Sequence, residues 1–124
     1  MTSKGVILVV EDEVLIRLSA VDTLEAAGYE VIEAGNADAA IKILEARPDI
    51  RLVFTDVAMP GSMDGLKLAH YVRDRWPPIH LIVTSGHLVV QEGALPLGAK
   101  FFGKPYLDRQ ISQAIQMMLT RDIG

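Results

Sequence analysis

The sequence predicts an α/β fold in which helices cover both faces of an open parallel sheet. Five short apolar segments alternate along the chain with five segments that have helical features. Such apolar runs suit strands that are buried on both faces, and their alternation with helices is typical of a parallel sheet. With 124 residues and no cysteine, the chain suits one domain, residues 1–124, that folds without disulfides or a cysteine-bound zinc.

Three of the expected strands are continuous apolar runs, and two have a weaker pattern. Val6–Val10, Leu52–Thr55 and Leu81–Thr84 are rich in β-branched side chains. Tyr29–Ala34 alternates between apolar and polar residues, whereas Lys100–Gly103 is short and aromatic.

Segments with helical periodicity connect these expected strands. Apolar residues recur every three or four positions within residues 14–24, 37–44 and 111–119. Residues 64–75 are a further expected helix, and the last helix should cover residues 107–121. Gly28 follows the first helix and Asn36 can cap the second.

The fourth crossover, residues 86–99, is the least helical of the five. Gly93, Pro96 and Gly98 interrupt it. We expect one short helix near Val89–Ala94, followed by a loop.

The charge distribution excludes several function classes. Residues 1–62 hold five Lys and Arg against eleven Asp and Glu, while residues 63–124 hold seven against five. The sequence has no basic stripe of the kind that direct nucleic-acid binding needs. The longest early apolar run, Val6–Val10, has five residues, whereas a membrane span needs roughly 20. We therefore expect a cytoplasmic protein without a membrane segment.

Polar residues follow four of the expected strands, where an open α/β sheet places its binding site. They are Glu11, Asp12 and Glu13 after the first strand, Asp56 after the third, Thr84 and Ser85 at the fourth, and Lys104 after the fifth.

Carboxylates gathered at one sheet edge repel each other unless a cation neutralises them. Oxygen ligands without nearby His or Cys favour Mg²⁺. A lysine and a hydroxyl on neighbouring strands can then contact a phosphoryl group, with Asp56 as the nucleophile. Each residue also has an ordinary interpretation: the acidic run can cap the first helix, Asp56 can be a turn residue, and Lys104 can be solvated.

In combination, the motifs resemble the receiver domain of two-component response regulators over almost the whole chain. They are Val9–Glu13, Thr55–Gly61, Asp64-Gly65, Val83–Gly86 and Gly98–Pro105. The resemblance implies a flavodoxin-like, doubly wound domain with a five-stranded parallel sheet of order 2-1-3-4-5 and five helices.

The resemblance also implies a role for each site residue. Asp56 would accept phosphate, and Asp12, Asp56 and the Ala58 backbone carbonyl would bind Mg²⁺, with Glu11 acting through water. Ser85 and Lys104 would contact the phosphoryl group. We prefer Ser85 to Thr84 because it precedes Gly86 and follows Pro77 by eight residues.

Two further residues have roles implied by the same resemblance. Phe101 matches the aromatic residue that turns inward on phosphorylation, although plain core packing also explains it. The Lys104-Pro105 peptide bond would be cis, a geometry that proline makes accessible.

Two positions depart from the family pattern or leave a role open. Ala58, two residues after Asp56, has no polar side chain that could orient water. His87 could do so or could face solvent. We therefore expect slow hydrolysis of the phosphorylated form.

The expected partners are a sensor histidine kinase or a histidine phosphotransfer protein. A downstream protein would bind the surface around the fourth crossover, the fifth strand and the last helix. The chain would be a stand-alone or N-terminal receiver, and a monomer or a weak phosphorylation-dependent dimer.

Three alternatives to this signalling switch are less well supported. A phosphohydrolase would normally carry a second aspartate at the position of Ala58. A non-phosphorylated interaction module would normally lack one of the site residues. Gly98–Lys104 matches the start of a P-loop, but Pro105 replaces the expected Ser or Thr.

Overall fold

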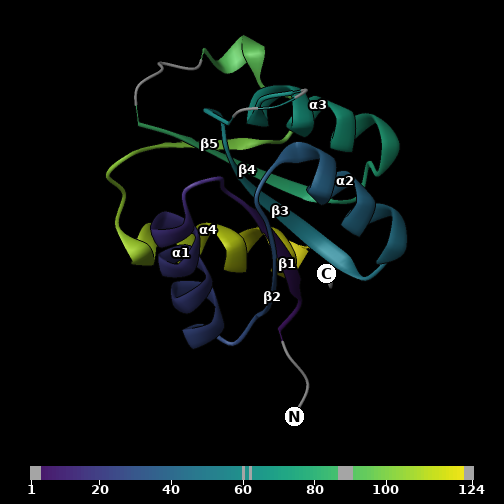
Figure 1. Ribbon diagram of the computed structural model, residues 1–124. Coiled ribbons are helices and arrows are strands. Elements are labelled where there is room, and N and C mark those ends of the chain that lie inside the picture. The colour runs from purple at the N-terminus through teal and green to yellow at the C-terminus, as the bar shows by residue number, and fades with distance from the viewer. Residues whose placement is uncertain (1–3, 60, 62, 87–90, 122–124) are drawn as a thin grey trace.

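The computed structural model describes residues 4–59, 61, 63–86 and 91–121, in which five parallel strands form one sheet of order β2-β1-β3-β4-β5 (Figure 1). The predicted sheet order is therefore confirmed. The strands are β1 (Val6–Val10), β2 (Glu30–Ala34), β3 (Ile50–Asp56), β4 (His80–Ser85) and β5 (Lys100–Gly103).

Two layers of helices enclose the sheet (Figure 1). On one face, α2 (Ala37–Ala46) and α3 (Gly65–Arg75) pack on the apolar side chains of β1, β3 and β4. On the opposite face, α1 (Val14–Ala26) and α4 (Asp108–Arg121) pack on the alternate residues of the same strands. Burial on both faces explains why the central strands are continuously apolar.

Side-chain caps fix the first turns of two helices. Asn36 accepts a hydrogen bond from the Ala39 backbone N–H at 2.8 Å, so the predicted cap of α2 is confirmed. Asp64 accepts one from the Lys67 N–H at 2.8 Å and begins α3 in the same way.

The predicted doubly wound fold is confirmed, and the described residues contain four α-helices and one 3₁₀ turn, η1 (Glu92–Ala94). Of the helix expected near Val89–Ala94, the described residues 91–94 contain only this turn, and residues 87–90 lie outside the described part. The reason lies in the glycines and proline of this crossover, together with its contacts to α3. His70 Nε2 lies 2.7 Å from the Ala94 carbonyl oxygen, and Arg73 Nε donates to the Leu97 carbonyl at 2.9 Å.

The register places the carboxyl ends of four strands at one edge of the sheet. Val10 is opposite Thr55 in the β1–β3 pair, Asp56 is opposite Thr84, and Ser85 is opposite Gly103. Among the described residues, no helix is long and apolar enough to cross a membrane.

Candidate functional site

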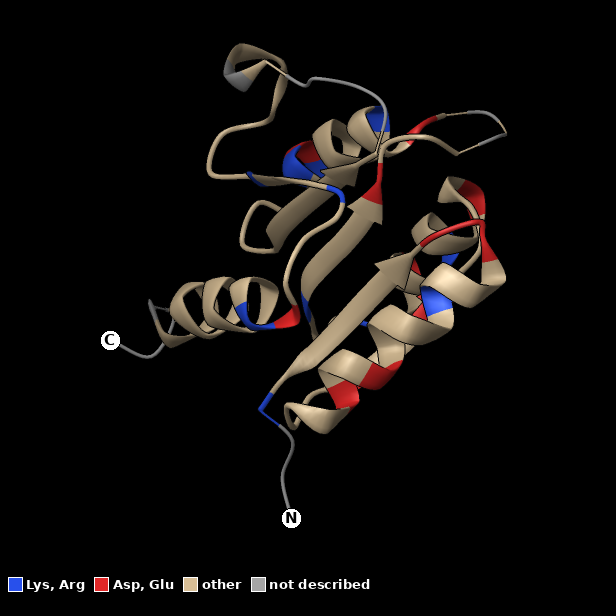
Figure 2. Cartoon of the chain, turned by 90° about the vertical axis from the view of Figure 1, so that its left-hand side faces the viewer, with Lys and Arg blue, Asp and Glu red and all other residues tan. Residues whose placement is uncertain are grey.

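Three acidic side chains meet at this edge of the sheet. Carboxylate oxygens of Glu11, Asp12 and Asp56 all lie within 4.8 Å of one another. Glu11 and Asp56 are buried, whereas Asp12 is half-buried. Figure 2 shows acidic segments at the tips of central strands. The predicted acidic cluster is therefore present in the fold.

Lys104 brings a positive charge into the same cluster. Its Nζ lies 3.1 Å from Asp56 Oδ1 and 3.3 Å from Glu11 Oε1. Burial alone would lower the pKa of Lys104, but its ion pairs with the carboxylates of Asp56 and Glu11 outweigh burial and raise the pKa. The ammonium group therefore stays charged at neutral pH.

Asp56 Oδ1 is a buried oxygen whose hydrogen-bonding capacity is not met. Among the described residues it has no hydrogen-bond partner, although the Lys104 ammonium lies beside it as an ion pair. Buried polar atoms are nearly always hydrogen-bonded, so an exception needs an explanation. Here the oxygen faces further carboxylates, which cannot donate when ionised.

Burial and the neighbouring charge of Asp56 both oppose ionisation of Glu11. Its pKa is raised chiefly because burial disfavours the ionised carboxylate, and the nearby charge of Asp56 adds to this effect. A hydrogen bond from the Glu13 backbone N–H to Glu11 Oε2, 3.1 Å long, partly opposes the shift.

The ordinary interpretation of Glu11-Asp12-Glu13, that it caps α1, holds only in part. Glu13 is the N-cap residue, but its side chain makes no capping hydrogen bond. Instead, Arg17 holds the loop after β1, because its Nη1 donates to the Glu11 carbonyl at 2.8 Å and its Nε to Glu33 Oε1 at 3.0 Å. No sequence motif identified Arg17 as part of this arrangement.

Gly65 has a structural role that the sequence motif did not explain. A Cβ atom at this first position of α3 would lie 1.7 Å from the Asp56 carbonyl oxygen. Real Cβ contacts are never this short, so only glycine allows α3 to approach the end of β3. The Asp64-Gly65 motif included this glycine but did not show why the position requires it.

The two candidate hydroxyls, Thr84 and Ser85, are both buried, and they lie on opposite faces of β4. Ser85 shares a face with Val83, which is opposite Phe101 in the β4–β5 register. Phe101 is half-buried and packs against the cluster that contains Val83. The geometry thus places the preferred hydroxyl, Ser85, and the expected switch residue, Phe101, on one face.

The remaining predicted positions are placed as follows. Ala58 is exposed just beyond Asp56, so its side chain leaves this part of the site open. The Lys104-Pro105 peptide bond is cis, as expected. His87 lies outside the described residues.

The donor set fits a hard divalent cation such as Mg²⁺. Three carboxylates converge, one of their buried oxygens lacks a hydrogen bond, and Lys104 supplies a single positive charge. The candidate ligands are all oxygen atoms, which Mg²⁺ prefers. The backbone carbonyl of Ala58, two residues after Asp56 in the sequence, stays a predicted ligand.

Comparison with known proteins identifies similar chains. The response regulator receiver domain profile matches residues 7–116. The response regulator receiver protein CpdR of Brucella abortus is 33% identical over 116 residues, covering 91% of this chain and 95% of CpdR. A receiver domain structure from Clostridium thermocellum has a TM-score of 0.87 at 27% identity, covering 95% of this chain and 96% of the other.

Longer proteins also contain a similar segment. The sensor kinase CckA of Brucella abortus is 34% identical over 128 residues, which cover 98% of this chain but only 13% of CckA. The chain therefore corresponds to one part of that kinase and to nearly all of CpdR.

Proposed function

The chain belongs to the response regulator receiver domain family of two-component systems, and we propose that it is a phosphoacceptor switch centred on Asp56. Receiver domains are signalling domains, and the proposed chemistry is limited to the chain's own phosphorylation and slow dephosphorylation. The observation that carries the proposal is the buried Asp56 Oδ1, which lacks a hydrogen bond and lies between carboxylates and the Lys104 ammonium.

In the proposed transfer, an Asp56 carboxylate oxygen attacks the phosphorus atom of a phosphohistidine on a histidine kinase or phosphotransfer protein. A new O–P bond forms and the N–P bond breaks, so the electron pair returns to the imidazole nitrogen. Asp56 thereby becomes an acyl phosphate. The released imidazole either already carries a proton on its other ring nitrogen and leaves neutral, or takes up a proton from solvent.

Lys104 and Ser85 would stabilise the transferred group. The Lys104 ammonium, now paired with Asp56 and Glu11, can shift its contact to a phosphoryl oxygen when Asp56 is phosphorylated. The Ser85 hydroxyl, buried at the end of β4, can donate to a second oxygen. Fixed donors of this kind stabilise the charge that develops during transfer.

Mg²⁺ would be held by Asp12, Asp56 and the Ala58 carbonyl, with Glu11 acting through water. When bound, it neutralises the carboxylates and the phosphoryl oxygens. Without a cation, the net charge of the three ionised carboxylates and Lys104 is −2, counting three negative charges and one positive.

Output would pass through Ser85 and Phe101 to the surface around η1, β5 and α4, where a downstream protein binds. Phosphorylation would shift the equilibrium between two arrangements of this surface. The alternative function, a receiver-like interaction module that is never phosphorylated, uses the same surface without the chemistry at Asp56.

Intact-mass spectrometry separates these functions. The chain is incubated with acetyl phosphate, with and without Mg²⁺, beside Asp56→Asn and the control Asp22→Asn on the exposed side of α1. We expect a Mg²⁺-dependent gain of one phosphoryl group in the wild type and the control, and no gain in Asp56→Asn. Folded wild-type chain that gains nothing would favour the interaction module.

A further inference from the structure

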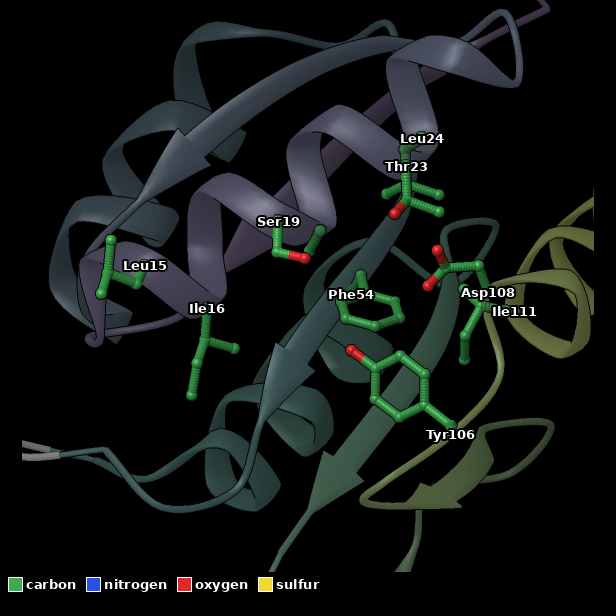
Figure 3. Close-up of a pocket in the computed structure, with 10 residues that line it drawn as sticks. Leu15, Ile16, Ser19, Thr23, Leu24, Phe54, Tyr106, Asp108 and Ile111 are labelled. Atoms are coloured by element: carbon green, nitrogen blue, oxygen red, sulfur yellow. The ribbon is translucent and has the colours of Figure 1, made fainter.

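A cavity of about 250 Å³ lies between α1 and the start of α4 (Figure 3). Its apolar lining includes Leu24 of α1, Phe54 of β3 and Ile111 of α4. Its volume equals that of about eight water molecules in the liquid, enough for an aromatic ring with a short chain.

Polar side chains are placed around this apolar lining. Ser19 and Thr23 contribute hydroxyls from α1, Tyr106 contributes a phenol, and Asp108 contributes a carboxylate. In Figure 3 the Asp108 carboxylate points away from α4, toward the side of the cavity that Phe54 and α1 form. An apolar pocket with a few convergent polar groups is the usual form of a small-molecule site.

The charge around the cavity selects the ligand. Asp108 is the only charged residue among those that line it in the described part of the chain. The first turn of α4 favours a carboxylate at this position, but it does not require one that faces the cavity. A cationic ligand would therefore be attracted, and an anionic one repelled.

Two aromatic rings shape the apolar part. Phe54 and Tyr106 contact each other edge to face, with centroids 6.1 Å apart and an interplanar angle of 76°. This arrangement can receive a third ring, and an aromatic face also attracts an ammonium group.

We propose that the cavity binds a small aromatic ammonium compound, with its ring against Phe54 and Tyr106 and its ammonium group on Asp108. Both rings are close in sequence to the phosphorylation site, since Phe54 precedes Asp56 by two residues and Tyr106 follows Lys104 by two. Occupancy would therefore bias the positions of Asp56 and Lys104, and this consequence, unlike the binding itself, rests on the proposed function.

Binding can be tested without any phosphodonor, so its failure and that of the proposed function are distinguishable. 2-Phenylethylammonium is titrated into the chain by calorimetry and by NMR, beside the neutral 2-phenylethanol and the anionic 3-phenylpropionate. We expect the ammonium compound to bind most tightly and to show nuclear Overhauser contacts with the rings of Phe54 and Tyr106.

Variants locate the site. Asp108→Asn should weaken binding of the ammonium compound about tenfold, as expected for a lost charge-assisted contact, while Asp22→Asn, which is outside the cavity, should leave it unchanged. Ser19→Phe should fill the cavity and abolish binding. Equal affinity for the ammonium and the alcohol, unchanged affinity in Asp108→Asn, or no binding to the wild type would each overturn the proposal.

Discussion

Replacing Asp12 with Asn removes one of three clustered negative charges while it keeps the shape of the side chain. In the absence of a divalent cation, we expect this substitution to stabilise the fold. Asp12 is the natural choice because it is half-buried, whereas Glu11 and Asp56 are buried and pair with Lys104.

The magnitude follows from the spacing of the carboxylates. At 4.8 Å, the upper limit of their separation, each pair of charges repels by about 1 kcal/mol in the dielectric of water and by about 3.5 kcal/mol at an effective dielectric of 20. Asp12 takes part in two such pairs, but solvent screens it and its attraction to Lys104 opposes part of the gain. We expect the free energy of unfolding to rise by about 1–2 kcal/mol, or roughly 5 °C in melting temperature.

Mg²⁺ should reverse the order of stability. A cation at a hundredfold excess over its Kd stabilises the folded wild type by about 2.7 kcal/mol, and Asp12→Asn should lose most of that effect. Urea unfolding followed by the fluorescence of Trp76, the single tryptophan, measures both quantities in EDTA and in Mg²⁺. The control is Asp22→Asn, an exposed substitution on α1, the helix that follows Asp12. If Asp12→Asn is less stable than the wild type in EDTA, or gains as much from Mg²⁺, the electrostatic reasoning is refuted.

Three further predictions test neighbouring parts of the site. In metal-free buffer, the raised pKa of Glu11 means that the folded chain binds a proton at Glu11 more tightly than the unfolded chain does. Protonation of Glu11 therefore stabilises the fold at low pH, and this stabilisation is lost as the pH rises through the pKa of Glu11 in the folded chain. Urea midpoints of the wild type and Glu11→Gln across a pH series check this. Gly65→Ala should destabilise the fold by about 3 kcal/mol or more, because its Cβ meets the Asp56 carbonyl; Gly93→Ala, with open space around it, should change little in the same unfolding assay. Ala58→Asn should speed the loss of phosphate several-fold by orienting water, as measured by intact mass over time; an unchanged rate would contradict this explanation.

The central sheet could be predicted because its strands are buried on both faces. β1 and β5 have the bounds that the apolar runs indicated. β3 begins two residues earlier than expected, since Arg51 interrupts the apolar pattern. The Arg51 guanidinium donates to the Leu119 carbonyl at 3.0 Å, a long-range contact that no local pattern reveals.

The fourth crossover was harder to predict because its conformation depends on α3. Gly93, Pro96 and Gly98 correctly indicated a broken helix, but the contacts from His70 and Arg73 join residues 24 positions apart. Local propensity carries no information about such contacts.

The site residues could be located because parallel strands bring their carboxyl ends to one edge. That rule placed Glu11, Asp12, Asp56 and Lys104 together, as the ion pairs and carboxylate distances show. The need for glycine at position 65 could not be predicted, because it follows from the approach of α3 to the Asp56 carbonyl in three dimensions.

The most direct test of the switch is to identify the residue that carries the phosphate. Sodium borohydride reduces an acyl phosphate to the alcohol, so a phosphorylated aspartate becomes homoserine. After treatment with acetyl phosphate and Mg²⁺, peptide mapping should find homoserine at position 56 and the unchanged residue at Asp12 and Asp64. Phosphate that resists borohydride on Thr84 or Ser85, or homoserine at another aspartate, would contradict the assignment of Asp56 as the phosphoacceptor.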